Sequence, residues 1–132
     1  MNYMDYEEKY FDYLIGKTLI KIKISKDERK ILLKTTENET FEMFHEQDCC
    51  EDVYLDEVHG DFEDILNTPI LEAEEITNSE LPKKNVRDES FTWTFYKLRT
   101  IKGSVTLKWY GSSNGYYSET VGLFKILKTK NK

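Results

Sequence analysis

Apolar and charged residues alternate in the segment 18–25, and this pattern constrains the fold more than any other feature of the chain. Ile20, Ile22 and Ile24 each stand next to a charged or polar residue, so that every second side chain is apolar. A period of two places these isoleucines on one face of a β-strand and the intervening lysines on the other. The segment therefore predicts a strand with one face in water.

Two shorter segments, 31–36 and 40–45, follow this strand. They are rich in apolar and β-branched residues and are separated by the polar turns KDERK and ENET. Short runs between polar turns are typical of consecutive antiparallel strands. We therefore expect a three-stranded meander in the first half of the chain.

The residues before this meander favour a helix. In the segment 4–14, Met4, Tyr10, Phe11 and Leu14 recur near helical spacing, acidic residues occupy the first turn and a glycine follows the last. These are the signals of a short amphipathic helix. We therefore expect a helix near the N-terminus.

The middle of the chain carries mixed signals. Residues 53–58 are compatible with a strand or with one helical turn, and both alternatives stay open. Residues 61–66 favour a short helix, because Asp61 can cap its first turn and the proline at position 69 ends it. Residues 70–76 are an expected strand.

The last third of the chain is rich in strand signals. Residues 91–98, 104–110 and 116–124 carry aromatic and β-branched residues, and Asn114–Gly115 favours a turn because both residues tolerate positive φ. The polar segment 77–90 is expected to be the most flexible loop. The core candidates are the side chains that share one side of the first two strands: Phe91, Trp93, Phe95, Val105, Leu107 and Trp109.

Together these elements predict one α+β domain over residues 1–132. Its sheet is expected to be mainly antiparallel with about six to seven strands, accompanied by the N-terminal helix and one short central helix. A chain of 15.7 kDa can bury a core without a disulfide or a structural metal. Residues 125–132 contain four lysines and are expected to form a flexible basic tail.

Charge divides the chain more sharply than the net charge of -6 suggests. Residues 37–80 contain 16 acidic residues and no lysine or arginine, whereas residues 81–132 carry eight more basic than acidic residues. Because phosphates need basic side chains, we expect no direct binding of duplex DNA through residues 37–80. Two interpretations stay open: an ordinary solvated face neutralised by neighbouring lysines, or an exposed acidic patch that attracts a basic partner.

Three stretches carry a resemblance to a known family: HEQDCCEDVYLDEVHGDFEDILNTPILEAEE, WTFYKLRTIKGSVTLKWYG and SNGYYSE. Over residues 41–121 the chain resembles a small family of uncharacterised bacteriophage and prophage proteins, centred on the DCCE cluster and two aromatic strands. The family has no established activity, so the resemblance implies no catalytic residues. It implies a small accessory protein of a phage or mobile element, a setting rich in inhibitors of bacterial defence systems.

The densest group of possible metal ligands surrounds the two cysteines. His45, Cys49 and Cys50 lie close together in the sequence, but adjacent cysteines point to opposite faces of an extended chain and do not match the spacing of zinc sites. We expect no metal and no cofactor; a metal, if bound, would use His45 and one cysteine. We expect one buried and one partly exposed cysteine in a reducing compartment. The surrounding acids also disfavour a thiolate nucleophile.

Alternation separates neighbouring aromatic residues as well. Trp109 and Tyr110 cannot both face the core from one strand, and the same holds for Tyr116 and Tyr117. One member of each pair should face outward or pack under a loop. Exposed tyrosine and tryptophan rings are typical anchors of protein interfaces or stacking platforms for nucleotides.

The leading hypothesis is a non-enzymatic phage or mobile-element accessory protein that inhibits a bacterial defence system by binding a host macromolecule. The expected partner is a host protein with a basic surface, such as a nucleic-acid-binding defence protein. The residues expected to contact it are Asp48, Glu51, Asp52, Asp56, Glu57, Asp61, Glu63, Asp64, Trp109, Tyr110, Tyr116 and Tyr117.

Two alternatives belong to other functional classes. One is a protein that sequesters a nucleotide signal in a pocket lined by aromatic rings and by Arg99 or Lys108. The other is a metal- or cysteine-dependent enzyme centred on His45–Glu51, although no known catalytic motif is present. No apolar stretch approaches the length of a membrane span and no signal peptide is apparent, so we expect a protein of the host-cell cytosol.

Overall fold

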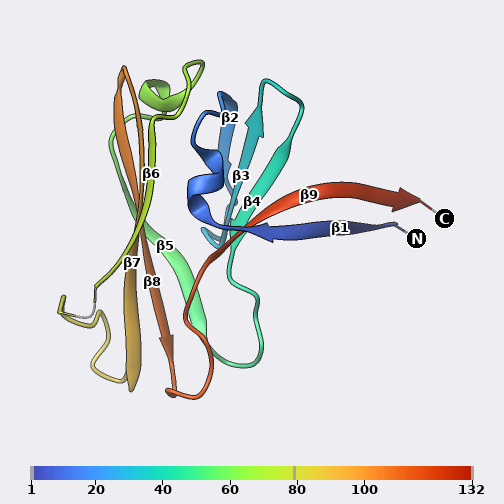
Figure 1. The fold of residues 1–132 in the computed structure, drawn as a ribbon. Coiled ribbons are helices and arrows are strands. Elements are labelled where there is room, and N and C mark those ends of the chain that lie inside the picture. Colours follow the sequence, from blue (N-terminus) through green and yellow to red (C-terminus); the bar gives the residue numbers. More distant parts are fainter. Residues whose placement is uncertain (1, 79, 132) are drawn as a thin grey trace.

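The computed structural model describes residues 2–78 and 80–131, and the side chains of residues 5–78 and 80–127. The described residues form nine strands and two short 3-10 helices, and no α-helix occurs among them. The strands make two antiparallel sheets that face each other (Figure 1). The expected α+β class is therefore wrong, because the fold is a β-sandwich.

The first sheet has five strands in the order β1-β9-β4-β3-β2. They are β1 (Asn2–Lys9), β2 (Leu19–Ile24), β3 (Lys30–Thr35), β4 (Thr40–Phe44) and β9 (Gly122–Asn131). The meander of β2, β3 and β4 is confirmed, with each strand antiparallel to the next. The C-terminal strand β9 lies between β4 and β1, so the two ends of the chain are neighbours in this sheet (Figure 1).

The second sheet has four strands in the order β5-β8-β7-β6. They are β5 (Asp52–His59), β6 (Glu72–Asn78), β7 (Ser90–Thr100) and β8 (Gly103–Ser113). The ambiguous residues 53–58 thus belong to a strand. The long β7–β8 hairpin forms the centre of this sheet, since β5 and β6 pair with its two outer edges.

The expected N-terminal helix over residues 4–14 is wrong. Most of that segment is strand β1, whose backbone pairs with β9, a partner more than a hundred residues away that no local pattern reveals. The segment ends in a single 3-10 turn, η1 (Phe11–Leu14). Because a 3-10 helix has three residues per turn, Phe11 and Leu14 point to the same side, and both are buried.

The expected central helix is also a 3-10 turn, η2 (Phe62–Ile65). Its predicted cap is present: the Asp61 carboxylate accepts a hydrogen bond of 3.1 Å from the backbone N–H of Glu63. The turn ends at Ile65, and Asn67, two residues further on, has a positive φ of 64°. No helix in the described part of the chain is both long and apolar enough to cross a membrane.

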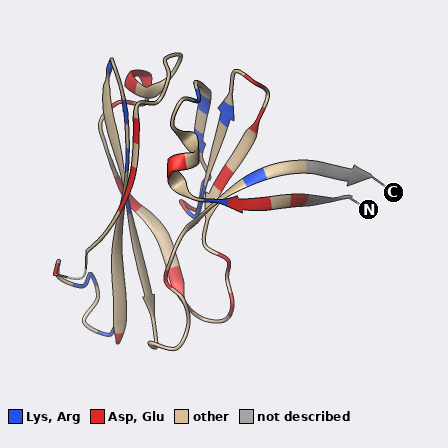
Figure 2. Cartoon of the chain, viewed as in Figure 1, with Lys and Arg blue, Asp and Glu red and all other residues tan. Residues whose placement is uncertain are grey.

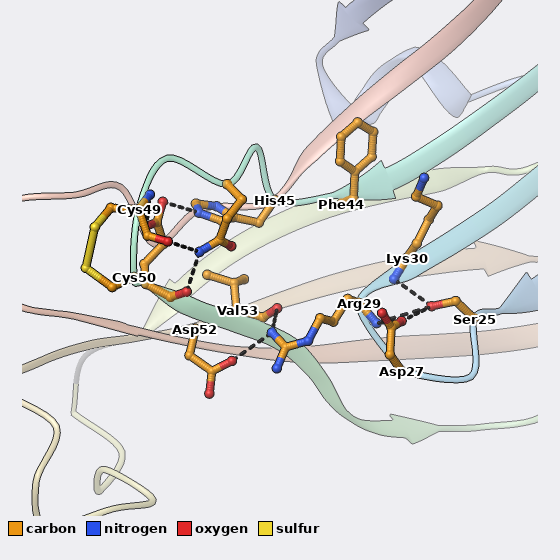
Figure 3. A pocket seen from close by; sticks show the side chains of 12 residues that line it. Ser25, Asp27, Arg29, Lys30, Phe44, His45, Cys49, Cys50, Asp52 and Val53 are labelled. Carbon is orange, nitrogen blue, oxygen red and sulfur yellow. Dashed lines mark hydrogen bonds and ion pairs between the residues drawn. A yellow bond between two sulfur atoms is a disulfide. The ribbon is translucent and has the colours of Figure 1, made fainter. Parts of the chain in front are cut away.

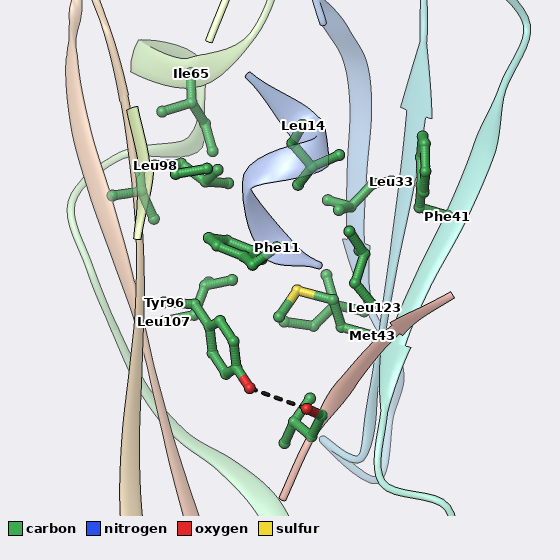
Figure 4. Packing of buried hydrophobic residues seen from close by; sticks show 14 of the residues in the cluster. Phe11, Leu14, Leu33, Phe41, Met43, Ile65, Tyr96, Leu98, Leu107 and Leu123 are labelled. Carbon is green, nitrogen blue, oxygen red and sulfur yellow. Dashed lines mark hydrogen bonds between the residues drawn. The ribbon is translucent and has the colours of Figure 1, made fainter. Parts of the chain in front are cut away.

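The core lies between the sheets, and η1 fills the space between them (Figure 4). Phe11 packs edge-on against Tyr96, with 4.9 Å between ring centroids. The Tyr96 hydroxyl donates a hydrogen bond of 3.0 Å to the carbonyl of Val121, and burial raises its pKa above the usual range of tyrosine. The fully buried side chains include Leu14, Leu19, Ile31, Leu33, Phe41, Met43, Ile65, Leu98 and Trp109.

Only half of the predicted core face of the β7–β8 hairpin is correct. Val105, Leu107 and Trp109 of β8 point inward and are buried. In β7 the inward side chains are instead Thr94, Tyr96 and Leu98, because Tyr96 lies opposite Leu107 in the register and Trp93 lies opposite Tyr110. Phe91, Trp93 and Phe95 therefore line the outer face of the second sheet.

The segment 80–89, expected to be a flexible loop, covers these outward aromatic rings. Trp93 donates a hydrogen bond of 3.1 Å from Nε1 to the carbonyl of Pro82. The Tyr110 hydroxyl accepts a hydrogen bond of 3.2 Å from the backbone N–H of Lys84 and donates one of 2.5 Å to Asp88. Burial, together with Asp88, raises the pKa of Tyr110 to about 12. Tyr110 is thus the member of its pair that packs under a loop.

The expected tail begins inside β9. This strand runs to Asn131 and pairs with β1 over its length. The side chains of residues 128–131, and residue 132 altogether, lie outside the described part of the structure. That residues 125–132 move freely stays a prediction.

Candidate functional site

The 16 acidic residues of segment 37–80 do not gather on one surface. They lie on both sheets and in the loops between them (Figure 2). Several form ion pairs with lysine or arginine at 4.0 Å or less, so that the neutralised-face interpretation holds for them. These are Glu37, Glu39, Glu42, Asp52, Asp56, Glu57 and Glu72.

Glu51, a predicted contact residue, is buried, and its carboxylate organises the loop around it. Its carboxylate accepts hydrogen bonds from the backbone N–H groups of Asp48 (2.9 Å) and Cys49 (2.8 Å) and from Nε2 of His45 (2.8 Å). The Nδ1 atom of His45 lies within hydrogen-bond distance, 2.6 Å, of the carbonyl oxygen of Thr120. Burial alone would raise the pKa of Glu51, but these hydrogen bonds outweigh it and lower the pKa to about 2.

This loop carries the two cysteines at the rim of a recess of about 860 Å³ (Figure 3). Cys49 and Cys50 are both exposed and are joined by a disulfide, so the expectation of one buried and one partly exposed cysteine is wrong. The Sγ atoms of these adjacent residues can bond because the loop turns both side chains to the same side of the backbone. The recess also contains the ion pair between Arg29 and Asp52, with 2.7 Å between Nη1 and Oδ1.

The chemistry of this recess gives little support to catalysis or metal binding. A disulfide sulfur is neither a thiolate nucleophile nor a metal ligand. Both ring nitrogens of His45 are already hydrogen-bonded within the protein. Among the described residues, no group of three histidine, cysteine or acidic side chains is arranged to hold a metal ion.

The other predicted contact residues are dispersed. Asp48 is exposed in the cysteine loop, whereas the exposed Asp61 and Glu63 and the half-buried Asp64 belong to η2, at the other end of β5. Between them, Asp56 pairs with Lys84 and Glu57 lies 4.0 Å from Lys108. The structure therefore does not bring these acids into one surface.

The predicted aromatic anchors differ in how exposed they are. Trp109 and Tyr110 are only 1% and 2% exposed, so neither presents its ring to a partner. Tyr116 is 83% exposed and Tyr117 half-buried, and their rings contact edge-to-face at 5.0 Å. The basic residues of the expected nucleotide pocket are also occupied: Arg99 pairs with Glu72 at 2.6 Å, and Lys108 lies over the Trp93 ring.

A different surface collects acidic and apolar side chains where η1 meets the edge strand β6. Gly16 donates a backbone hydrogen bond of 2.8 Å to Ile70, which fixes η1 beside the start of β6. Tyr10, Asp12 and Glu75 line one small recess at this junction, and Glu8 lines a second recess with Tyr10 and Asp12. We call this set the η1–β6 surface: Glu8, Tyr10, Asp12 and Glu75.

The acids of the η1–β6 surface are not neutralised within the described part of the chain. Glu8, Asp12 and Glu75 form no ion pair with any described lysine or arginine, and all three are exposed. Burial and the nearby Glu8 carboxylate raise the pKa of Glu75. Figure 2 shows acidic segments of β1, η1 and β6 on the same side of the molecule. Lys9 lines one of the two recesses as well, but it pairs with Glu7 at 2.6 Å, so the three carboxylates are left without it.

An aromatic side chain lies among these acids. Tyr10 is 88% exposed and lines both recesses with Asp12. An apolar centre with a charged rim is the usual composition of a protein interface, with tyrosine among its most frequent anchors. The surface therefore combines carboxylates with an exposed aromatic ring.

The sequence analysis missed this surface for two reasons. Glu8 and Asp12 precede the acid-rich segment and belong to the segment 4–14, where acids fit the predicted amphipathic helix. Their proximity to Glu75 depends on how the two sheets face each other, which no local pattern encodes.

Comparison with known proteins gives a family and no function. The model of a domain of unknown function, DUF7448, matches residues 12–123. That range begins within η1 and contains all strands from β2 to β8. No curated protein and no solved structure matches the chain.

Proposed function

The chain belongs to the DUF7448 family of domains of unknown function, and from this premise we propose that it is a non-catalytic binding protein whose η1–β6 surface binds a basic partner protein. The observation that carries the proposal is the juxtaposition of unneutralised acids with the exposed ring of Tyr10. Acids raise the rate of encounter with a basic partner, and the ring supplies contact area.

The same chemistry identifies the class of partner. A basic groove that normally holds nucleic acid presents arginine and lysine side chains to solvent, and an acidic surface with an aromatic centre can occupy it. We propose that the protein acts in this way as an accessory protein of a phage or mobile element, in the host cytosol, by occluding a nucleic-acid-binding defence protein. The family resemblance described above supports this setting.

Two variants test the proposal. Tyr10→Ala removes the anchor, and the triple variant Glu8→Lys, Asp12→Lys, Glu75→Lys reverses the charge around it. The wild type is first used to capture proteins from host lysate at 50 mM salt, and these are identified. Each captured protein is then purified, and its binding is measured by calorimetric titration. We expect Tyr10→Ala to weaken binding about tenfold, which corresponds to about 1.4 kcal/mol for an interface anchor. The triple variant should weaken it further and abolish its salt dependence.

A matched control separates site-specific charge from total charge. The variant Glu63→Lys, Glu80→Lys, Glu89→Lys changes the net charge by the same amount at exposed positions away from the η1–β6 surface. It should bind the purified partner within about twofold of the wild type. Equal losses in both triple variants, or unchanged binding by Tyr10→Ala, would refute the proposed surface.

A further inference from the structure

The outward face of β2 and β3 is basic. Lys21 lies directly opposite Lys34 in the antiparallel register, and Lys23 lies opposite Leu32. These lysines are exposed, because the alternate residues of both strands, such as Leu33, point into the core. Basic segments are visible on β2 and β3 in Figure 2.

No acidic partner compensates these lysines within the described part of the chain. Lys21, Lys23 and Lys34 form no ion pair there, whereas the neighbouring Lys30 pairs with Glu42 at 3.3 Å. Like charges directly opposite each other in an antiparallel pair are destabilising. An anion held between Lys21 and Lys34 would remove this repulsion, so the face favours a negatively charged ligand.

The face is also hollowed. A recess of about 380 Å³ opens between Lys23, Lys26 and Lys30, with Leu32 contributing to its lining. Glu42 also lines this recess, where it pairs with Lys30, so the lining carries three lysines and one acid. An extended anionic chain could follow the lysines across β2 and β3 and enter this recess.

Aromatic rings continue the same face toward β1. Phe44 lies opposite Lys30 in the register, and the Lys30 ammonium lies 5.1 Å from the centre of its ring. Tyr6 is 46% exposed and contacts Phe44 edge-on at 6.0 Å. Basic side chains that alternate with partly exposed rings on a sheet are the usual platform for single-stranded nucleic acid.

We propose that this face binds single-stranded nucleic acid, with Lys21, Lys23 and Lys34 on the phosphates and the ring of Tyr6 against a base. An acidic peptide would satisfy the lysines but would leave the ring without a planar partner. A duplex would offer its phosphates but not its stacked bases. The proposal rests on residues outside the η1–β6 surface, so either proposal can fail without the other.

Fluorescence anisotropy with the full chain tests this proposal. The probes are a labelled 20-nucleotide thymidine strand, the corresponding duplex, a polyglutamate peptide and inorganic polyphosphate. We expect the single strand to bind with a slope of about -2 in log affinity against log salt, as three lysine–phosphate contacts require. The variant Lys21→Glu, Lys23→Glu, Lys34→Glu should lose at least tenfold in affinity.

Two comparisons make the result specific. The variant Lys83→Glu, Lys97→Glu, Lys102→Glu carries the same charge change on or beside the second sheet and should bind the single strand within about twofold of the wild type. Tyr6→Ala should weaken binding of the single strand but not of polyphosphate, which has no bases. Polyglutamate binding as tight as the single strand, equal losses in both triple variants, or no binding of the strand at 50 mM salt would overturn the proposal.

Discussion

Glu51 shows how one buried carboxylate can shape a loop. Its oxygens accept two backbone N–H groups and the imidazole of His45, so that the loop with Cys49 and Cys50 is held against the end of β4. Gln47 adds hydrogen bonds of 3.0 Å and 2.7 Å to the carbonyls of Cys49 and Glu51. The carboxylate is therefore a structural group, not an exposed contact for a partner.

The lowered pKa of Glu51 predicts a specific loss of stability in acid. Its folded-state pKa of about 2 lies below the ordinary value of 4.5, so the folded protein favours the ionised form. This stabilisation is complete above pH 4.5 and disappears as the pH falls toward 2. The difference in urea midpoint between the wild type and Glu51→Gln should therefore shrink steadily over this range. A difference that stays constant between pH 6 and pH 3 would contradict this role.

At the scale of elements, Tyr110 holds the segment 80–89 over the outer face of the second sheet. Tyr110→Phe removes one hydrogen bond to Lys84 and one to Asp88. The free-energy difference between the closed and the opened loop should fall by about 1 kcal/mol. The opened population of the loop should then rise about fivefold. Limited trypsin digestion, read by mass spectrometry, should show faster cleavage after Lys83, Lys84 and Arg87. The control Tyr116→Phe, at an 83% exposed ring, should digest like the wild type.

The turn η1 is expected to contribute to stability through its buried ring rather than through its helical backbone. Phe11 is 5% exposed and packs against Tyr96 between the two sheets. Phe11→Ala should reduce the free energy of unfolding by about 3–5 kcal/mol, as do other large-to-small changes in a core. Tyr10→Ala, one residue away and 88% exposed, should change it by less than about 0.5 kcal/mol. Similar losses from both changes would contradict the assigned packing.

Strands were predictable from the sequence where their pattern is local. The alternation in β2 and the turns that follow it identified the meander, and aromatic runs identified β7 and β8. The N-terminal strand was missed because its partner β9 lies at the other end of the chain. The inward face of β7 was misassigned because the residues on both of its faces are apolar, so only pairing with β8 decides which side enters the core.

At the scale of the molecule, the sequence indicates the composition of the surface but not its arrangement. The acid-rich segment 37–80 is a continuous run in the chain, yet folding distributes it over two sheets and neutralises a large part of it. Lys17 and Lys125, from either side of that segment, both pair with Glu39. Candidate surfaces instead arise where separate elements meet, at η1 and β6 for the acids and at β2 and β3 for the lysines.

Hydrogen–deuterium exchange with a captured partner tests the central claim most directly, because it reports which backbone segments the partner covers. Binding through the η1–β6 surface predicts slower exchange in residues 8–16 and 71–76, with little change in the cysteine loop and η2. The Tyr10→Ala variant at the same partner concentration should show less protection in both segments. Protection confined to residues 46–52 or 61–66, with none at η1 and β6, would contradict the proposed binding surface.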